Sequence, residues 1–181
     1  LLESIKSDAV ELSGDKGHNI NLTNSASGSV MGDENQLRSA FSNIIFNAVK
    51  YTPAEGDVDI HWWSDNNGVH LSINDSGVGF DPIHMPRLTE RFYRADPSRY
   101  KDTGGSGLGL AIVKHVLRNH DGELEIKSSL GLGSEFVCHF PIVRHRAYDQ
   151  DPTVPFADAK MVVKDHRKRA SLFRQTSDDN A

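Results

Sequence analysis

The chain has 181 residues, 37% of them hydrophobic, and a formal net charge of −5. This length suits one domain with an additional tail. The charge is uneven: residues 144–181 carry eight Lys or Arg against six Asp or Glu, which leaves twelve basic and nineteen acidic residues in the body before them. An acidic body argues against non-specific binding of nucleic acid, which depends on neutralising phosphates.

Cysteine usage and hydropathy narrow the class of protein further. Cys138 is the only cysteine, so no disulfide can form within the chain, and a reducing compartment is expected. No apolar run approaches the roughly 20 residues that span a bilayer. We therefore expect a cytoplasmic domain in which Cys138 is a small buried residue of a strand.

The first part of the chain predicts two helices with a strand between them. Apolar residues at helical spacing indicate a helix over residues 2–12, and residues 18–23 are typical of a strand. A longer helix is expected from the N-cap residue Asp33 to Tyr51, because Thr52-Pro53 stops it. The apolar face of this helix consists of Leu37, Ala40, Phe41, Ile44, Ile45, Ala48 and Val49.

The second part predicts four strands, one helix and a long charged loop. The segment 81–106 resembles a loop with a short helix, and its length and charge indicate function. A helix over about residues 108–119 follows it. The four strands are expected over residues 58–63, 69–74, 123–128 and 134–141.

These elements predict an α+β fold in two layers, with a mixed sheet of about five strands backed by three helices. Residues 1–14 form a leading helix in this scheme, and residues 15–143 form the main domain. Residues 144–181 show no clear pattern and are expected to be a disordered basic tail.

A polar stripe follows one face of the helix that ends at Tyr51. Asn43 and Asn47 are one turn apart, so both amides leave the same face, and Lys50 follows three residues later. Mg²⁺ prefers oxygen ligands and tolerates partial hydration, so an amide oxygen together with phosphate oxygens suits it. Lys50 could serve as a point charge for phosphate. Taken alone, however, such a stripe is usually a solvated helix face.

Three glycine-containing segments follow. The first, Asp75-Ser-Gly77-Val-Gly79, comes directly after a strand, where a carboxylate could bond an adenine amino group and glycines allow close approach. The second, residues 104–110, opens a helix whose free N–H groups favour phosphate. It lacks the Gly-Lys-Ser/Thr ending of a P-loop, and no strand leads into it as in a dinucleotide fingerprint. The third, residues 131–133, is typical of a hairpin turn.

The order of these clusters changes their interpretation. Together they resemble the N box, the two main glycine boxes and the final glycine turn of the GHKL ATPases. The stretch from Arg87 to Asp96 resembles the F box of sensor histidine kinases, although Thr89 stands where Phe is common. With that variant, GGSGLGLAIVKH over residues 104–115 is similar to the sensor kinases of the phosphate regulon. The resemblance covers residues 1 to about 143.

This resemblance implies a role for each candidate site residue. Asn47 would hold Mg²⁺, with Asn43 assisting. Lys50 would meet phosphate, and Arg94 would reach the terminal phosphate of ATP. Asp75 would bond the adenine amino group. The other residues implied in nucleotide binding are Tyr51, Gly77, Gly79, Gly105, Gly107, Leu108 and Gly109.

The implied reaction moves the γ-phosphoryl group of Mg-ATP to a histidine on a dimerisation domain, and then to an aspartate of a response regulator. None of the nine histidines stands in the sequence context typical of that acceptor, so the dimerisation domain must supply it. Residues 1–14 resemble the trailing end of that domain. The full protein is expected to be a bacterial homodimer anchored in the inner membrane, with this domain in the cytoplasm and no direct binding of nucleic acid.

Two other functions remain open at this point. A GHKL serine kinase of the anti-sigma type would yield phosphoserine, but the F box disfavours it. A nucleotide-binding module that only docks partners would not support phosphotransfer, but the intact Asn47, Asp75 and glycine set disfavours it.

Overall fold

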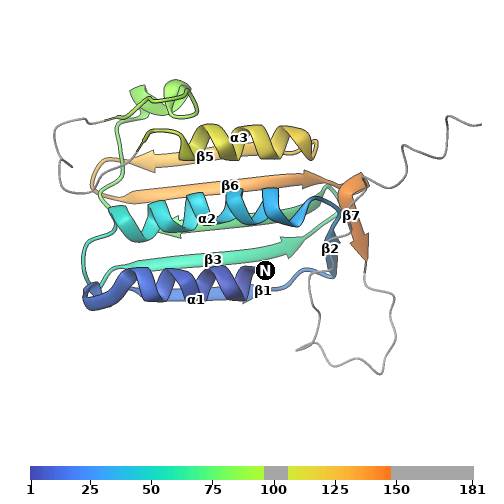
Figure 1. The fold of residues 1–181 in the computed structure, drawn as a ribbon, viewed down its shortest axis with the longest axis horizontal. Coiled ribbons are helices and arrows are strands. Elements are labelled where there is room, and N and C mark those ends of the chain that lie inside the picture. The colour runs from blue at the N-terminus through green and yellow to red at the C-terminus, as the bar shows by residue number, and fades with distance from the viewer. Residues whose placement is uncertain (96–105, 148–181) are drawn as a thin grey trace, which may run out of the picture.

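The computed structural model describes residues 1–95 and 106–147. A five-stranded sheet in the order β1-β3-β4-β6-β5 forms one layer (Figure 1). β1 is parallel to β3 and the other neighbouring pairs are antiparallel, so the sheet is mixed, as predicted. The strands are β1 (Asn19–Asn24), β3 (Asp57–Ser64), β4 (Gly68–Asp75), β5 (Glu123–Ser129) and β6 (Gly133–Pro141).

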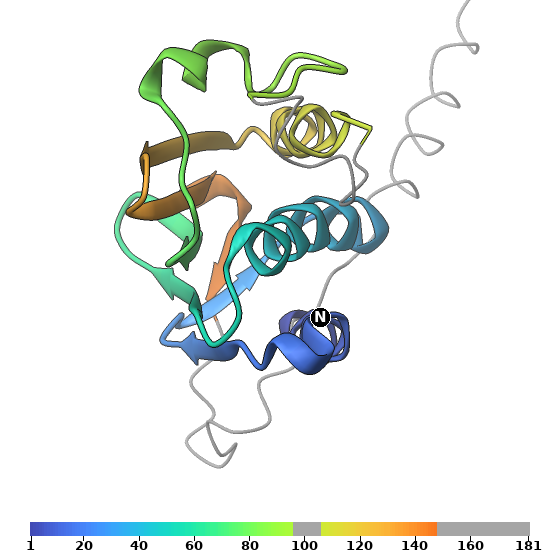
Figure 2. The same cartoon turned by 90° about the vertical axis from the view of Figure 1, so that its left-hand side faces the viewer.

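Helices cover one face of this sheet, which confirms the two-layer α+β fold (Figure 2). In the described ranges, none of them combines the length and the apolarity needed to cross a membrane. The α-helices are α1 (Leu2–Ser13), α2 (Glu34–Tyr51) and α3 (Gly109–Asn119). Short 3-10 helices are η1 (Gly14–Lys16), η2 (Pro82–Arg87) and η3 (Ile142–Arg144).

The core lies between the sheet and the helices. Alternate residues of each strand face it, because strand side chains alternate between the two faces. Phe41 of α2 packs at its centre, with ring centroids 6.3 Å from Trp62 and 6.1 Å from Phe140. Cys138 is fully buried in β6, as expected, and burial raises the pKa of its thiol to about 12. This thiol is therefore a packing residue rather than a nucleophile.

α2 is the element that connects the core to the site. Its N-terminus is capped by Asp33, whose carboxylate accepts hydrogen bonds from the backbone N–H groups of Asn35 and Gln36, as the sequence indicates. The seven apolar residues of its predicted face are all buried. Since the stripe fixes the rotation of the helix, the polar residues Asn43 and Asn47 are directed toward its neighbour α3 rather than into the core.

The open face of the sheet carries polar and aromatic side chains. His70 on β4 and His139 on β6 approach to 2.9 Å between their Nδ1 atoms, and Asp65 lies 3.0 Å from Nε2 of His70. His61 stacks on Trp63 at a centroid distance of 4.9 Å. The contact between His70 and His139 links β4 to β6 on the side away from the helices, whereas His61 and Trp63 both belong to β3.

A second, two-stranded sheet was not predicted. β2 (Gly28–Val30) pairs antiparallel with β7 (His145–Ala147). The ordered fold therefore continues past residue 143. The prediction that the chain is disordered from residue 144 is wrong for residues 145–147, which form β7. Strands of three residues are too short to show an alternating pattern, and their pairing depends on residues more than 100 positions apart. Residues 148–181 lie outside the described part of the chain.

Candidate functional site

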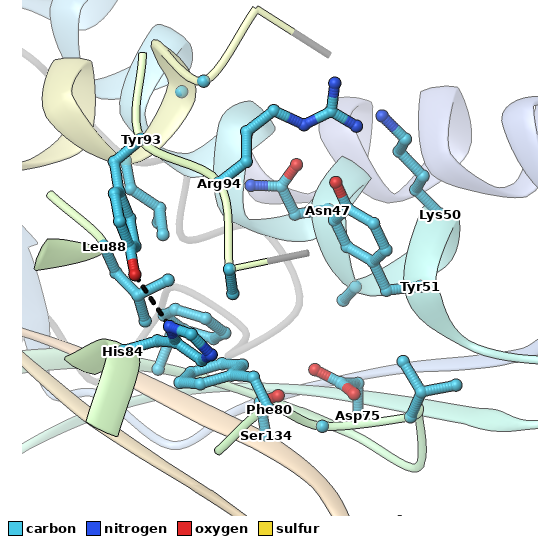
Figure 3. Close-up of a pocket in the computed structure, with 18 of the residues that line it drawn as sticks. Asn47, Lys50, Tyr51, Asp75, Phe80, His84, Leu88, Tyr93, Arg94 and Ser134 are labelled. Carbon is cyan, nitrogen blue, oxygen red and sulfur yellow. Dashed lines mark hydrogen bonds between the residues drawn. The ribbon is translucent and has the colours of Figure 1, made fainter. Parts of the chain in front are cut away.

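A cavity of about 600 Å³ opens between the second half of α2, the ends of β4 and β6, the segment around η2, and the start of α3 (Figure 3). Segments distant in the sequence thus meet at one place. The predicted site residues that line the cavity are Asn43, Asn47, Lys50, Tyr51, Asp75, Gly79, Arg94, Gly107 and Gly109. Gly77 and Leu108 are next to lining residues, and Gly105 lies outside the described residues.

α2 and α3 approach each other closely at the first residue of α3. A Cβ atom on Gly109 would lie 2.7 Å from Oδ1 of Asn43 and 3.7 Å from Nδ2 of Asn47. The amide nitrogen of Asn43 donates to the carbonyl of Ser39 at 2.8 Å, which directs its oxygen toward α3. Two side-chain amides and the beginning of a helix therefore share one wall, which a side chain at residue 109 would disrupt.

Two cations converge at one end of the cavity. Lys50 and Arg94 come from opposite walls and extend over the same space, with Asn47 and Tyr51 beneath them (Figure 3). The Lys50 ammonium also lies 5.2 Å from the centroid of the Tyr51 ring. Partial burial, and secondly the charge of Arg94, lower the pKa of Lys50. Two like charges held together in this way favour an anion between them.

A buried carboxylate marks the other end. Asp75 is the last residue of β4, is 6% exposed, and accepts hydrogen bonds from the backbone N–H of Gly77 at 2.9 Å and from that of Ser134. Burial raises the pKa of Asp75 to about 6, although these two bonds act in the opposite direction. A buried group of this kind, placed in a cavity, is typical of a functional site.

The turns that close the cavity require glycine. Gly79 has a φ of +57°, and a Cβ atom there would collide with the carbonyl of Ser129. Gly107 has a φ of +68°, and a Cβ there would lie 2.8 Å from the backbone of Phe92. Leu108 is the N-cap residue of α3 and provides no side-chain cap, so the first turn keeps N–H groups for another acceptor.

One wall of the cavity was not assigned from the sequence. It consists of residues around η2, with His84, Leu88 and Tyr93 facing the cavity, and Phe80 beside them (Figure 3). Tyr93 lies in the stretch that resembles the F box, but spacing gave no role for its hydroxyl, because this irregular segment has no period to interpret.

Comparisons with known proteins agree with this geometry. Residues 32–144 match the family of histidine kinase-, DNA gyrase B-, and HSP90-like ATPases. The phosphate regulon sensor protein PhoR of Pseudomonas aeruginosa is 59% identical over 140 residues, which is 77% of this chain and 32% of that protein. The chain thus spans about a third of the length of this curated relative.

Solved structures of sensor histidine kinases are also similar to this chain. A mycobacterial sensor histidine kinase, MprB, is 28% identical with a TM-score of 0.67, and the match covers 81% of this chain and 97% of that one. Full-length ShkA in complex with AMPPNP is 30% identical with a TM-score of 0.70, over 81% of this chain and 30% of that one. By its matched sequence and its fold, this chain belongs to the family of histidine kinase-, DNA gyrase B-, and HSP90-like ATPases.

Proposed function

We propose that this chain is the catalytic, ATP-binding domain of a two-component sensor histidine kinase. The observation that carries the proposal is one cavity with a buried carboxylate at one end and two converging cations at the other. An adenine nucleotide has the matching polarity, with an amino-bearing base at one end and phosphates at the other. The match to the ATPase family and to named sensor kinases supports the same function.

At the adenine end, Asp75 accepts a hydrogen bond from the amino group of the base. Its carboxylate is already oriented by the N–H groups of Gly77 and Ser134, so it needs no rearrangement to do so. The ring of Tyr51 lies against the base, and Gly79 lets the backbone approach it. Adenine rather than guanine is selected, because guanine has a carbonyl oxygen where adenine has the amino group.

At the phosphate end, Lys50 and Arg94 neutralise charge, and Arg94 reaches the terminal phosphate. Backbone N–H groups at the start of α3 donate hydrogen bonds to the phosphate oxygens, with Gly107 and Gly109 leaving room for them. Mg²⁺ would be held by the amide oxygen of Asn47, with Asn43 assisting, and would supply further neutralisation of the phosphates. Two amides are enough protein ligands for this ion, because phosphate oxygens and water molecules usually occupy the other coordination positions of Mg²⁺.

The transfer itself needs little chemistry from this domain. A neutral imidazole nitrogen forms a bond to the γ-phosphorus as the bond to the ADP oxygen breaks, and ADP leaves. Positioning and charge neutralisation therefore dominate. Asn43 cannot accept a proton at neutral pH, so it does not activate water as a carboxylate there could. We propose that this limits wasteful hydrolysis of ATP.

The whole protein supplies the acceptor histidine on a dimerisation domain, and a response-regulator aspartate then receives the phosphoryl group. Sensing of phosphate starvation is supported by the 59% identity to a phosphate regulon sensor protein. The whole protein is a membrane-anchored homodimer with this domain on the cytoplasmic side, and the domain binds no nucleic acid directly.

Calorimetric titration tests the binding half of this proposal. The chain is titrated with ATP and with GTP, each in the presence of Mg²⁺ and again with a chelator. ATP is expected to bind at least about tenfold more tightly than GTP, since GTP leaves the Asp75 carboxylate facing an oxygen. Equal binding of the two nucleotides, or binding of neither, would contradict the proposed site.

A further inference from the structure

The segment that carries Arg94 is anchored at two points immediately before that residue. The backbone N–H of Phe92 donates to the carbonyl of Gly107 at 2.9 Å. The hydroxyl of Tyr93 lies 2.7 Å from Nδ1 of His84, the hydrogen bond drawn in Figure 3. Arg94 follows directly, so its backbone position is set by both contacts.

The ring of Tyr93 is also held from its face. The guanidinium of Arg87 lies 4.2 Å from the ring centroid, at the distance of a cation–π contact. Arg87 is itself oriented by Glu90, which accepts a hydrogen bond from its Nε at 3.1 Å. Because His84 and Arg87 both belong to η2, this one short helix holds Tyr93 at its hydroxyl and at its ring.

η2 is a suitable support because its own start is fixed. The carboxylate of Asp81 caps it by accepting from the backbone N–H of Ile83 at 2.9 Å. The hydrogen bond to Tyr93 can form in either tautomer of His84, since the hydroxyl can donate to Nδ1 or accept from it. The link therefore does not require one protonation state of the imidazole.

Holding Arg94 in place has a consequence for the phosphate end. The Arg94 guanidinium reaches the phosphate end from this backbone, so a displacement of the backbone also displaces the group that meets the phosphate. We infer that His84 is a positioning residue that acts through Tyr93 to direct Arg94 at the terminal phosphate of ATP. This inference rests on the proposed function, because it assumes that ATP occupies the cavity.

ATP and ADP separate this role from a merely structural one. Arg94 meets the terminal phosphate that only ATP possesses, so loss of the His84–Tyr93 link should weaken ATP and spare ADP. If the pair only formed a wall of the cavity, both nucleotides would lose affinity together, because they share the adenine and ribose. The ratio of ATP to ADP affinity is therefore the measured quantity.

The experiment compares Tyr93→Phe, His84→Ala and His84→Asn in the full 181-residue chain by calorimetry with Mg-ATP and Mg-ADP. Tyr93→Phe and His84→Ala are expected to weaken ATP by about 3- to 10-fold and to leave ADP within about twofold. His84→Asn is expected to recover most of the ATP affinity, because its amide can replace Nδ1. His61→Ala is the matched control, since it removes a histidine and one hydrogen bond on the open face of the sheet.

Arg94→Ala completes the test. This substitution alone should lower the ratio of ATP affinity to ADP affinity. The double variant with Tyr93→Phe should show no further decrease in that ratio. The inference is overturned if Tyr93→Phe weakens both nucleotides equally, weakens neither, or adds its full effect to Arg94→Ala. An unmodified chain that binds neither nucleotide would instead refute the proposed function.

Discussion

Replacing Asp75 with asparagine is expected to stabilise the nucleotide-free domain. The carboxylate is 6% exposed, and burial raises its pKa from the usual 3.8 to about 6. At 1.36 kcal/mol per pKa unit, this rise corresponds to about 3 kcal/mol by which the fold disfavours the ionised form at neutral pH. Asparagine has the same shape without the charge, and its oxygen can still accept the N–H bond of Gly77.

The effect has a defined dependence on pH. Since the pKa is higher in the folded than in the unfolded chain, the folded state binds the proton more tightly between about pH 4 and pH 6. The contribution of Asp75 to stability is therefore lost as the pH rises through this window and stays lost above it. Asparagine has no such dependence. We expect Asp75→Asn to be about 1–3 kcal/mol more stable than the parent at pH 8, and nearly equal to it at pH 4.

The same substitution should impair nucleotide binding. If the amide oxygen of the new asparagine accepts the hydrogen bond from Gly77, the NH₂ group of the same side chain faces the amino group of adenine. Two hydrogen-bond donors then meet in a buried place. The loss is about 1–3 kcal/mol, or roughly 5- to 150-fold in affinity for ATP. Urea denaturation at both pH values and calorimetry with Mg-ATP measure the two effects. No gain in stability at pH 8, or an unchanged affinity for ATP, would refute this account of Asp75.

Three further outcomes are expected. When the pH is lowered below about 6, Asp75 takes up a proton, and the affinity for Mg-ADP should decrease. Calorimetry should show a steeper decrease for the parent than for Asp75→Asn. Asn43→Glu should raise the slow release of phosphate from ATP by up to about 10²-fold, and an unchanged rate in a variant that still binds Mg-ATP would exclude our role for Asn43. Truncation after Arg144 removes β7 and should lower Tm by a few degrees, whereas truncation after Ala147 should retain both Tm and ATP affinity in calorimetric scans.

The elements with a strong local signal could be predicted from the sequence. α2 combines an N-cap at Asp33, a long apolar stripe and a proline stop, and each of these depends on residues close to one another in the chain. The cavity could be anticipated for another reason. Asn47, Asp75 and Gly107 come from three separate elements, and only the order of their motifs, matched to a family, indicates that they meet.

What could not be predicted depends on contacts between distant or irregular segments. The pairing of β2 with β7 joins two three-residue strands, each too short to be recognised alone. The bond between His84 and Tyr93 depends on how the chain turns after η2, where Phe92 adopts a φ of +64°. A positive φ is uncommon for a residue other than glycine, so the local sequence favours other conformations at Phe92. The hydrogen bond to Gly107 stabilises the observed conformation.

Phosphotransfer to an isolated dimerisation domain tests the central claim most directly. The chain is incubated with γ-labelled Mg-ATP, alone and together with that domain carrying its acceptor histidine, and the label on each protein is treated with acid and with alkali. We expect label only on the dimerisation domain, labile in acid and stable in alkali, and none after replacement of the acceptor histidine. Acid-stable label on a serine would indicate a different kinase, and absence of any label despite bound ATP would contradict the assignment as a histidine kinase domain.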